Sequence, residues 1–140
     1  MKDISKMVSK IDNALQFNRT VLNLRAARQE LIASNIANVD TPNYKAKDID
    51  FAKTLQGAIS GNTAKLQMAG TVPHHLSSSP GENVMGAPVM FRNVVQPSAD
   101  GNTVDMDVER AQFADNALRY EASVKFVDSQ IKSVLTALQG

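Results

Sequence analysis

Two adjacent histidines are the residues of this chain whose type is most suited to metal chemistry. His74 and His75 follow Pro73 in a Gly- and Pro-rich stretch. Adjacent side chains diverge, and no H-E-x-x-H or similar spacing supplies a third ligand. We therefore predict solvated or interfacial histidines and no metal site.

A short acidic stretch near residue 100 superficially resembles a calcium-binding loop. The stretch contains Asp100, Asn102, Asp105 and Asp107, residue types that can bind calcium. In a loop that starts at Asp100, however, the sixth position is Asp105 instead of glycine, and the twelfth is Ala111 instead of glutamate. These residues instead predict a turn and the N-cap of a helix.

Residues for nucleophilic catalysis are also missing from the pattern. Ser34 has no histidine near it in sequence, and the chain contains no G-x-S-x-G elbow, no glycine-rich phosphate loop and no cysteine. We predict that the protein is not an enzyme and that it binds no cofactor.

Composition limits the remaining classes. The 140 residues suit one domain, and 43% hydrophobic with 21% charged residues is ordinary for a soluble protein. The net charge is +1 without a run of like charges, so we expect no nucleic-acid partner. No apolar run is long enough to span a bilayer, and the first residues lack the features of a secretory signal. We therefore expect any export to proceed without a cleaved signal peptide.

Two long helices are predicted at the ends of the chain. Apolar residues recur at helical spacing over residues 1–39, interrupted by Asn18, Arg25 and Gln29. Over residues 105–140 the spacing is an unbroken heptad pattern, for which Asp105 or Asp107 is the expected N-cap. We call these heptad positions the C-terminal seam: Phe113, Ala117, Tyr120, Val124, Val127, Ile131, Val134 and Leu138.

The expected fold is mainly α, with the two terminal helices paired as an antiparallel coiled-coil hairpin through their apolar seams. Between them, residues 40–104 form a turn and an extended middle region of a single domain, 1–140. Asp50 is placed to cap a short helix that carries Phe51, Leu55 and Ile59. Residues 64–68 and 89–95 have the composition of short strands that pair with each other. The Gly, Pro and Ser content of residues 61–103 favours disorder until a partner binds.

The segment after the first helix is rich in residues that end helices and build turns. Pro42 disfavours helical geometry at Thr41, so we expect the helix to end near Asn38. Short polar side chains on the last helical turns, Ser34 and Asn35, suit a close-packed interface that reaches a neighbouring backbone. We interpret this segment as a docking surface.

The same residues resemble the axial proteins of the bacterial flagellum, whose first helix ends in a pattern like SNIANxxTPGY. The matching positions are Ser34, Asn35, Ile36, Ala37, Asn38, Thr41, Pro42 and Tyr44. Asn43 replaces the usual glycine, but asparagine tolerates a left-handed backbone. Further positions are similar to proximal rod subunits in particular: Asp48, Phe51, Asp100, Gly101, Asn102 and Asp105.

This resemblance implies a structural subunit of the proximal rod, a tubular drive shaft that links the inner-membrane ring to the distal rod and transmits torque. The implied partners are further copies, other rod proteins, a rod-to-ring adaptor and the ring protein, with passage through the flagellar type III export apparatus. The implied location is the rod of the basal body in the periplasmic space. A soluble helical adaptor or export chaperone that binds a partner's helix remains the alternative.

Overall fold

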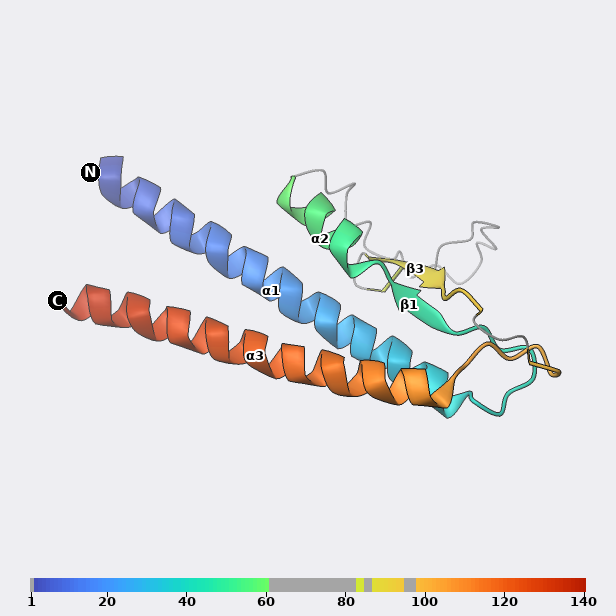
Figure 1. Ribbon diagram of the computed structural model, residues 1–140. Coiled ribbons are helices and arrows are strands. Elements are labelled where there is room, and N and C mark those ends of the chain that lie inside the picture. Colours follow the sequence, from blue (N-terminus) through green and yellow to red (C-terminus); the bar gives the residue numbers. More distant parts are fainter. Residues whose placement is uncertain (1, 61–82, 85–86, 95–97) are drawn as a thin grey trace, which may run out of the picture.

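A computed structural model of the chain describes residues 2–60, 83–84, 87–94 and 98–140. Two long helices, α1 (Lys2–Ala37) and α3 (Met106–Gln139), lie side by side and run antiparallel (Figure 1). The predicted helical hairpin is therefore confirmed, with helix bounds within two residues of those expected. The described helices include none that is both long and apolar enough to cross a membrane.

Local capping explains where the long helices begin and end. The Oδ1 atom of Asp105 accepts hydrogen bonds from the backbone N–H groups of Asp107 (3.0 Å) and Val108 (3.2 Å) at the start of α3. At the end of α1, Asn38 Nδ2 donates to the Ser34 carbonyl (2.8 Å). The bonds to Asp105 satisfy backbone N–H groups that no helical turn can pair, and they confirm Asp105 as the cap. The Ser34 carbonyl also accepts the Asn38 backbone N–H at 3.1 Å.

A small sheet and a short helix occupy the middle of the chain. Strands β1 (Lys47–Ile49), β2 (Asn83–Val84) and β3 (Ala87–Phe91) form an antiparallel sheet in the order β1-β3-β2. Helix α2 (Phe51–Ile59) follows β1 directly, and Asp50 Oδ1 accepts a hydrogen bond from the Lys53 backbone N–H at 3.0 Å. The short helix and its cap are thus confirmed.

The strand predictions fared less well. Strand β3 overlaps the expected strand 89–95 but begins earlier, and its neighbours are β1 and β2. Strand β1 was not expected from the sequence, since Lys47 and Asp48 lack strand propensity. The expected strand 64–68, with its pairing to 89–95, and the two histidines His74 and His75 lie outside the described residues.

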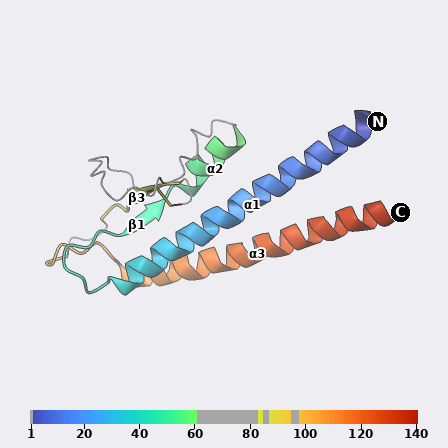
Figure 2. The ribbon, with the colours of Figure 1, turned by 180° about the vertical axis from the view of Figure 1, so that it is seen from behind.

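The apolar core is small and lies at one end of the hairpin. Helix α1 runs between α3 on one side and the sheet with α2 on the other (Figures 1 and 2). The core is made where α1 meets the sheet and α2: Leu24, Leu31, Ile49 and Ala87 are buried, with Phe51, Leu55 and Val89 packed against them. Toward the chain termini, residues 3–10 of α1 are all exposed.

Amides and charged groups, rather than the apolar seam, pair α3 with α1. Asn116 is fully buried, and its Nδ2 donates to the Arg25 carbonyl (2.9 Å) and to Gln29 Oε1 (2.6 Å). Further toward the termini, Asn18 Nδ2 donates to Gln130 Oε1 at 2.7 Å. These amides fix the register of the two helices.

Only part of the C-terminal seam lies on the pairing face within the chain. Its large members are exposed to 39% at Phe113, 42% at Val124 and 44% at Ile131. Only Val127 and Val134 are half-buried. The stripe that contains Asn116 faces α1, where Nδ2 of Asn116 is paired and its Oδ1 is buried without a hydrogen-bond partner. The heptad stripe is displaced to one flank of the helix pair.

Candidate functional site

The two sequence blocks that resemble axial proteins meet at the tip of the hairpin, opposite the chain termini (Figure 1). Asn102, exposed to only 5%, places its Nδ2 within 2.8–2.9 Å of three carbonyl oxygens. They belong to Asn38, Val39 and Thr41, just after α1. Its Oδ1 accepts from the Val104 N–H at 2.8 Å. One side chain therefore joins the end of α1 to the approach to α3.

Two left-handed residues allow these segments to come close together. Asn43 has φ 60°, as the sequence predicted for a residue in the place of glycine, and its N–H donates to the Asp100 carbonyl at 2.9 Å. Gly101 has φ 74°, and a Cβ atom there would lie 2.4 Å from Asn43 Oδ1. Only glycine fits at position 101, because both the backbone angle and the available space exclude a side chain.

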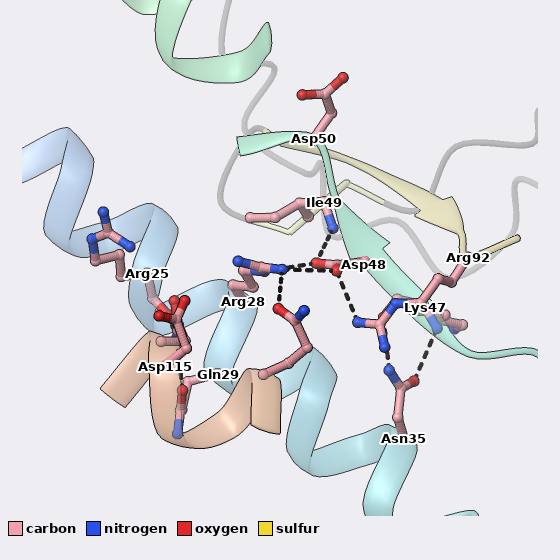
Figure 3. Close-up of polar contacts among 12 residues, drawn as sticks. Arg25, Arg28, Gln29, Asn35, Lys47, Asp48, Ile49, Asp50, Arg92 and Asp115 are labelled. Atoms are coloured by element: carbon pink, nitrogen blue, oxygen red, sulfur yellow. Dashed lines mark hydrogen bonds and ion pairs between the residues drawn. The ribbon is translucent and has the colours of Figure 1, made fainter. Parts of the chain in front are cut away.

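Asn35 joins α1 to strand β1 in the same manner. This fully buried amide donates from Nδ2 to the Lys47 carbonyl (2.8 Å) and accepts the Lys47 N–H at Oδ1 (2.9 Å), as Figure 3 shows. It also donates to Glu109 Oε2 at 3.2 Å. The backbone that Asn35 reaches thus belongs to its own chain, so its side chain positions the tip and does not present itself to a neighbour.

A network of ion pairs lies beside Asn35. Arg28 binds both carboxylate oxygens of Asp48, at 3.0 and 3.2 Å, and donates to Gln112 Oε1 at 2.8 Å. Arg92, which follows β3, bridges Asp48 (2.8 Å) and Glu109. The network therefore links α1, the sheet and α3 (Figure 3). Sequence reasoning missed Arg92, because its partners lie on other elements and no local spacing marks it.

The two carboxylates of this network are shifted in opposite directions. Burial favours a raised pKa at Asp48, but hydrogen bonds from Arg28, Arg92 and the Ile49 N–H outweigh it, so the pKa is lowered. At Glu109 burial dominates over the hydrogen bond from Asn35 and the charge of Arg92, and the pKa is raised. The ionised form of Asp48 therefore stabilises the fold, whereas burial disfavours the ionised form of Glu109.

The remaining predicted residues lie around the contacts described above. Ser34, Ala37, Thr41 and Pro42 are exposed at the tip, while Ile36 and Tyr44 are half-buried. The Tyr44 hydroxyl lies 3.2 Å from Ser34 Oγ. Phe51 lies away from the tip and packs against the core. We call the connected set the motif joint: Asn35, Asn43, Asp48, Arg92, Gly101, Asn102 and Glu109.

The motif joint is chemically suited to holding segments together. Its described groups are amides bonded to backbone and carboxylates paired with arginines, an arrangement that fixes geometry and leaves no base free to activate a nucleophile. No group of three or more His, Cys, Asp or Glu residues capable of holding a metal ion occurs in the described ranges. The fold and this joint define a structural protein built on a helical hairpin.

Comparison with known proteins gives the family. Residues 15–45 match the family model described as flagella basal body rod protein. The chain is 45% identical over 139 residues to the flagellar basal body rod protein FlgB of Salmonella typhimurium, covering 96% of this chain and 99% of that protein. The Escherichia coli FlgB is 46% identical over 140 residues, covering 95% and 98%. The Buchnera aphidicola FlgB is 35% identical over 136 residues, covering 96% and 100%. The chain therefore belongs to the flagellar basal body rod protein family.

Proposed function

We propose that this chain is a structural subunit of the proximal rod, in which it links the inner-membrane ring to the distal rod and transmits torque. Family membership makes it a structural subunit of the flagellar basal body rod. The observation that supports this proposal most is a contrast between two regions. The motif joint is closed by buried polar bonds, whereas the C-terminal seam is exposed on the hairpin. A tube built from such subunits needs rigid elements with apolar faces that neighbours can cover.

The exposed seam is the assembly surface in this proposal. Phe113, Tyr120 and Ile131 present apolar side chains on one flank of α3, and Tyr120 lines a hollow of about 330 Å³ that also borders Ala26 and Gln29 of α1. Covering each large apolar side chain gains about 2 kcal/mol. Partners of matching chemistry are helices with apolar faces: further copies, other rod proteins, the rod-to-ring adaptor and the ring protein.

In this proposal the chain catalyses nothing, passes through the type III export apparatus without losing a signal peptide, and resides in the periplasmic part of the basal body. The paired carboxylates of the motif joint support a mechanical role, because a joint that closes three elements resists bending under load. The alternative of an adaptor or export chaperone is not favoured by the family.

A charge placed in the seam tests the proposal. Ile131→Asp should abolish incorporation into basal bodies, because a neighbour would bury an unpaired carboxylate at a cost of several kcal/mol at every copy. The matched control, Ser129→Asp, adds the same charge to an exposed residue off the seam and should leave motility intact.

Isolated basal bodies are probed for this subunit, motility is scored on soft agar, and export of each variant is checked separately. A motile Ile131→Asp strain would overturn the seam as an assembly surface. Detection of the unaltered chain only in the cytoplasm, bound to another flagellar protein, would support the adaptor instead.

A further inference from the structure

A second flank of the helix pair carries a hollow that the proposed function does not use. It has a volume of about 310 Å³ and lies between α1 and α3, between the core and the chain termini. Phe17, Val21 and Phe126 make its apolar wall, and Arg25 and Arg119 supply positive charge. Phe17 and Phe126 are exposed to 40% and 61%, so the hollow is open to solvent in the single chain.

Arg25 has no counterion in the described part of the chain. Its guanidinium stacks over the Phe51 ring at 4.6 Å, and its Nε is buried without a hydrogen-bond partner. The nearby Asp115 is already bound by Arg119, whose Nε lies 2.9 and 3.1 Å from the two carboxylate oxygens. Arg25 lines the hollow together with Phe17, Val21 and Phe126. The hollow therefore fits a ligand with a carboxylate and an apolar side chain beside it.

The first turns of α1 offer such a ligand and are exposed. Ile4 and Val8 are exposed to 69% and 60%. Asp12, one turn after Val8 on the same helix face, is exposed and takes part in none of the ion pairs found among the described residues. Figures 1 and 2 show this end of α1 diverging from α3.

Within one chain this segment cannot reach the hollow. Asp12 and Arg25 lie on the same helix, separated by 13 positions, or about 20 Å at a rise of 1.5 Å per residue. The carboxylate must therefore come from another molecule.

We propose that the N-terminal part of α1 from a second copy docks into this hollow, with Asp12 bound to Arg25 and Val8 packed against the phenylalanines. The proposal rests on the proposed function, since it names the contact through which copies join. One surface of each copy meets a different surface of the next, so the contact is heterologous and repeats along an open assembly.

Disulfide crosslinking can detect the contact, because the chain contains no cysteine. Two versions are co-expressed, one with Ser9→Cys beside Asp12 and one with Ala122→Cys in the hollow. Each copy has one cysteine, so a mixed disulfide in isolated basal bodies reports contact between two copies. Ala114→Cys, at an exposed position of α3 outside the hollow, is the matched control. We expect the link to Ala122→Cys to exceed the link to Ala114→Cys at least tenfold.

Charge reversal then tests the ion pair. Asp12→Arg should abolish the crosslink, as should Arg25→Glu, while the two changes together should restore it. Arg110→Glu, at an exposed position on α3, is the control and should leave it unchanged. Asp12 is exposed and takes part in no ion pair among the described residues, so we expect Asp12→Arg to leave the hairpin folded.

Each outcome decides the proposal. Equal amounts of disulfide to Ala122→Cys and to Ala114→Cys would overturn it. A crosslink that survives Asp12→Arg would overturn it as well. Loss of rod incorporation with Arg25→Glu but not with Asp12→Arg would assign the hollow to an acidic group of another protein and would also overturn it. If the two cysteine versions are present in basal bodies without the crosslink, this contact alone is refuted, whereas absence of the wild-type chain from basal bodies refutes the proposed function.

Discussion

The two ends of the hairpin are built on opposite principles. At the tip, buried amides and arginine–carboxylate pairs close α1, the sheet and α3 into the motif joint. At the end that carries the termini, residues 3–10 and most of the last turns of α3 are exposed, and a single described amide pair, Asn18 with Gln130, spans the helices there. The comparison indicates that the tip is closed within one chain, whereas the end that carries the termini leaves side chains exposed that neighbouring subunits could cover. We call this second end the open end.

Removing the bridging arginine should have the largest effect on the tip. In Arg92→Met, Asp48 keeps Arg28, but Glu109, whose side chain is only 1% exposed, loses its cation. We expect the free energy of unfolding to fall by about 3 kcal/mol, as for a broken buried pair. Urea unfolding followed by circular dichroism measures this. Arg110→Met, at an exposed arginine, should change stability by less than about 0.5 kcal/mol. Equal effects of the two substitutions would show that the tip is not held by this network.

A second substitution tests the close approach of the two sequence blocks. Gly101→Ala adds a Cβ that would lie 2.4 Å from Asn43 Oδ1, at a residue with φ 74°. We expect a loss of about 1–2 kcal/mol from the left-handed backbone alone. Gly57→Ala is the matched control, since nothing lies within 4 Å of its Cβ, and in the interior of α2 it should stabilise by up to about 1 kcal/mol. A neutral Gly101→Ala would mean that the tip opens easily.

The opposite pKa shifts of Asp48 and Glu109 predict opposite pH dependences. The lowered pKa of Asp48 contributes stability above its unfolded pKa, about 3.9, and this is lost as the pH falls through its folded pKa. The penalty of Asp48→Asn should therefore shrink below about pH 4. The raised pKa of Glu109 means that the fold gains stability as the pH falls through its folded pKa. The penalty of Glu109→Gln should therefore grow on mild acidification from pH 7. If the stability losses of Asp48→Asn and Glu109→Gln changed with pH in the same direction, these pKa shifts would be contradicted.

The smallest effect is expected at the open end. Replacing Asn18 and Gln130 together by leucine removes one amide pair, 2.7 Å long and only part-buried. Because both partners leave together, no polar group is stranded, and stability should change by less than about 1 kcal/mol. Thermal unfolding of the purified chain measures the change. A loss as large as that of Arg92→Met would erase the contrast between the two ends.

Local features of this fold could be read directly from the sequence. Helix periodicity, the caps at Asp50 and Asp105 and the left-handed backbone at Asn43 depend on residues within a few positions of each other. Such short-range preferences act wherever the segment lies. The two blocks of the candidate site were found by their resemblance to axial proteins, since each is a compact run of residues.

Tertiary structure alone decided which face of α3 meets α1 and which side chains close the joint. The heptad pattern indicated the apolar seam, but the folded helix turns toward α1 the stripe that contains Asn116, whose Nδ2 is bonded to Arg25 and Gln29, and leaves most of the seam exposed. Arg92 joins Asp48 and Glu109, residues far away in sequence that only the folded chain brings within reach. The sequence determined the elements because their signals are local, and the structure decided their pairing because buried polar groups must find partners wherever the whole chain provides them.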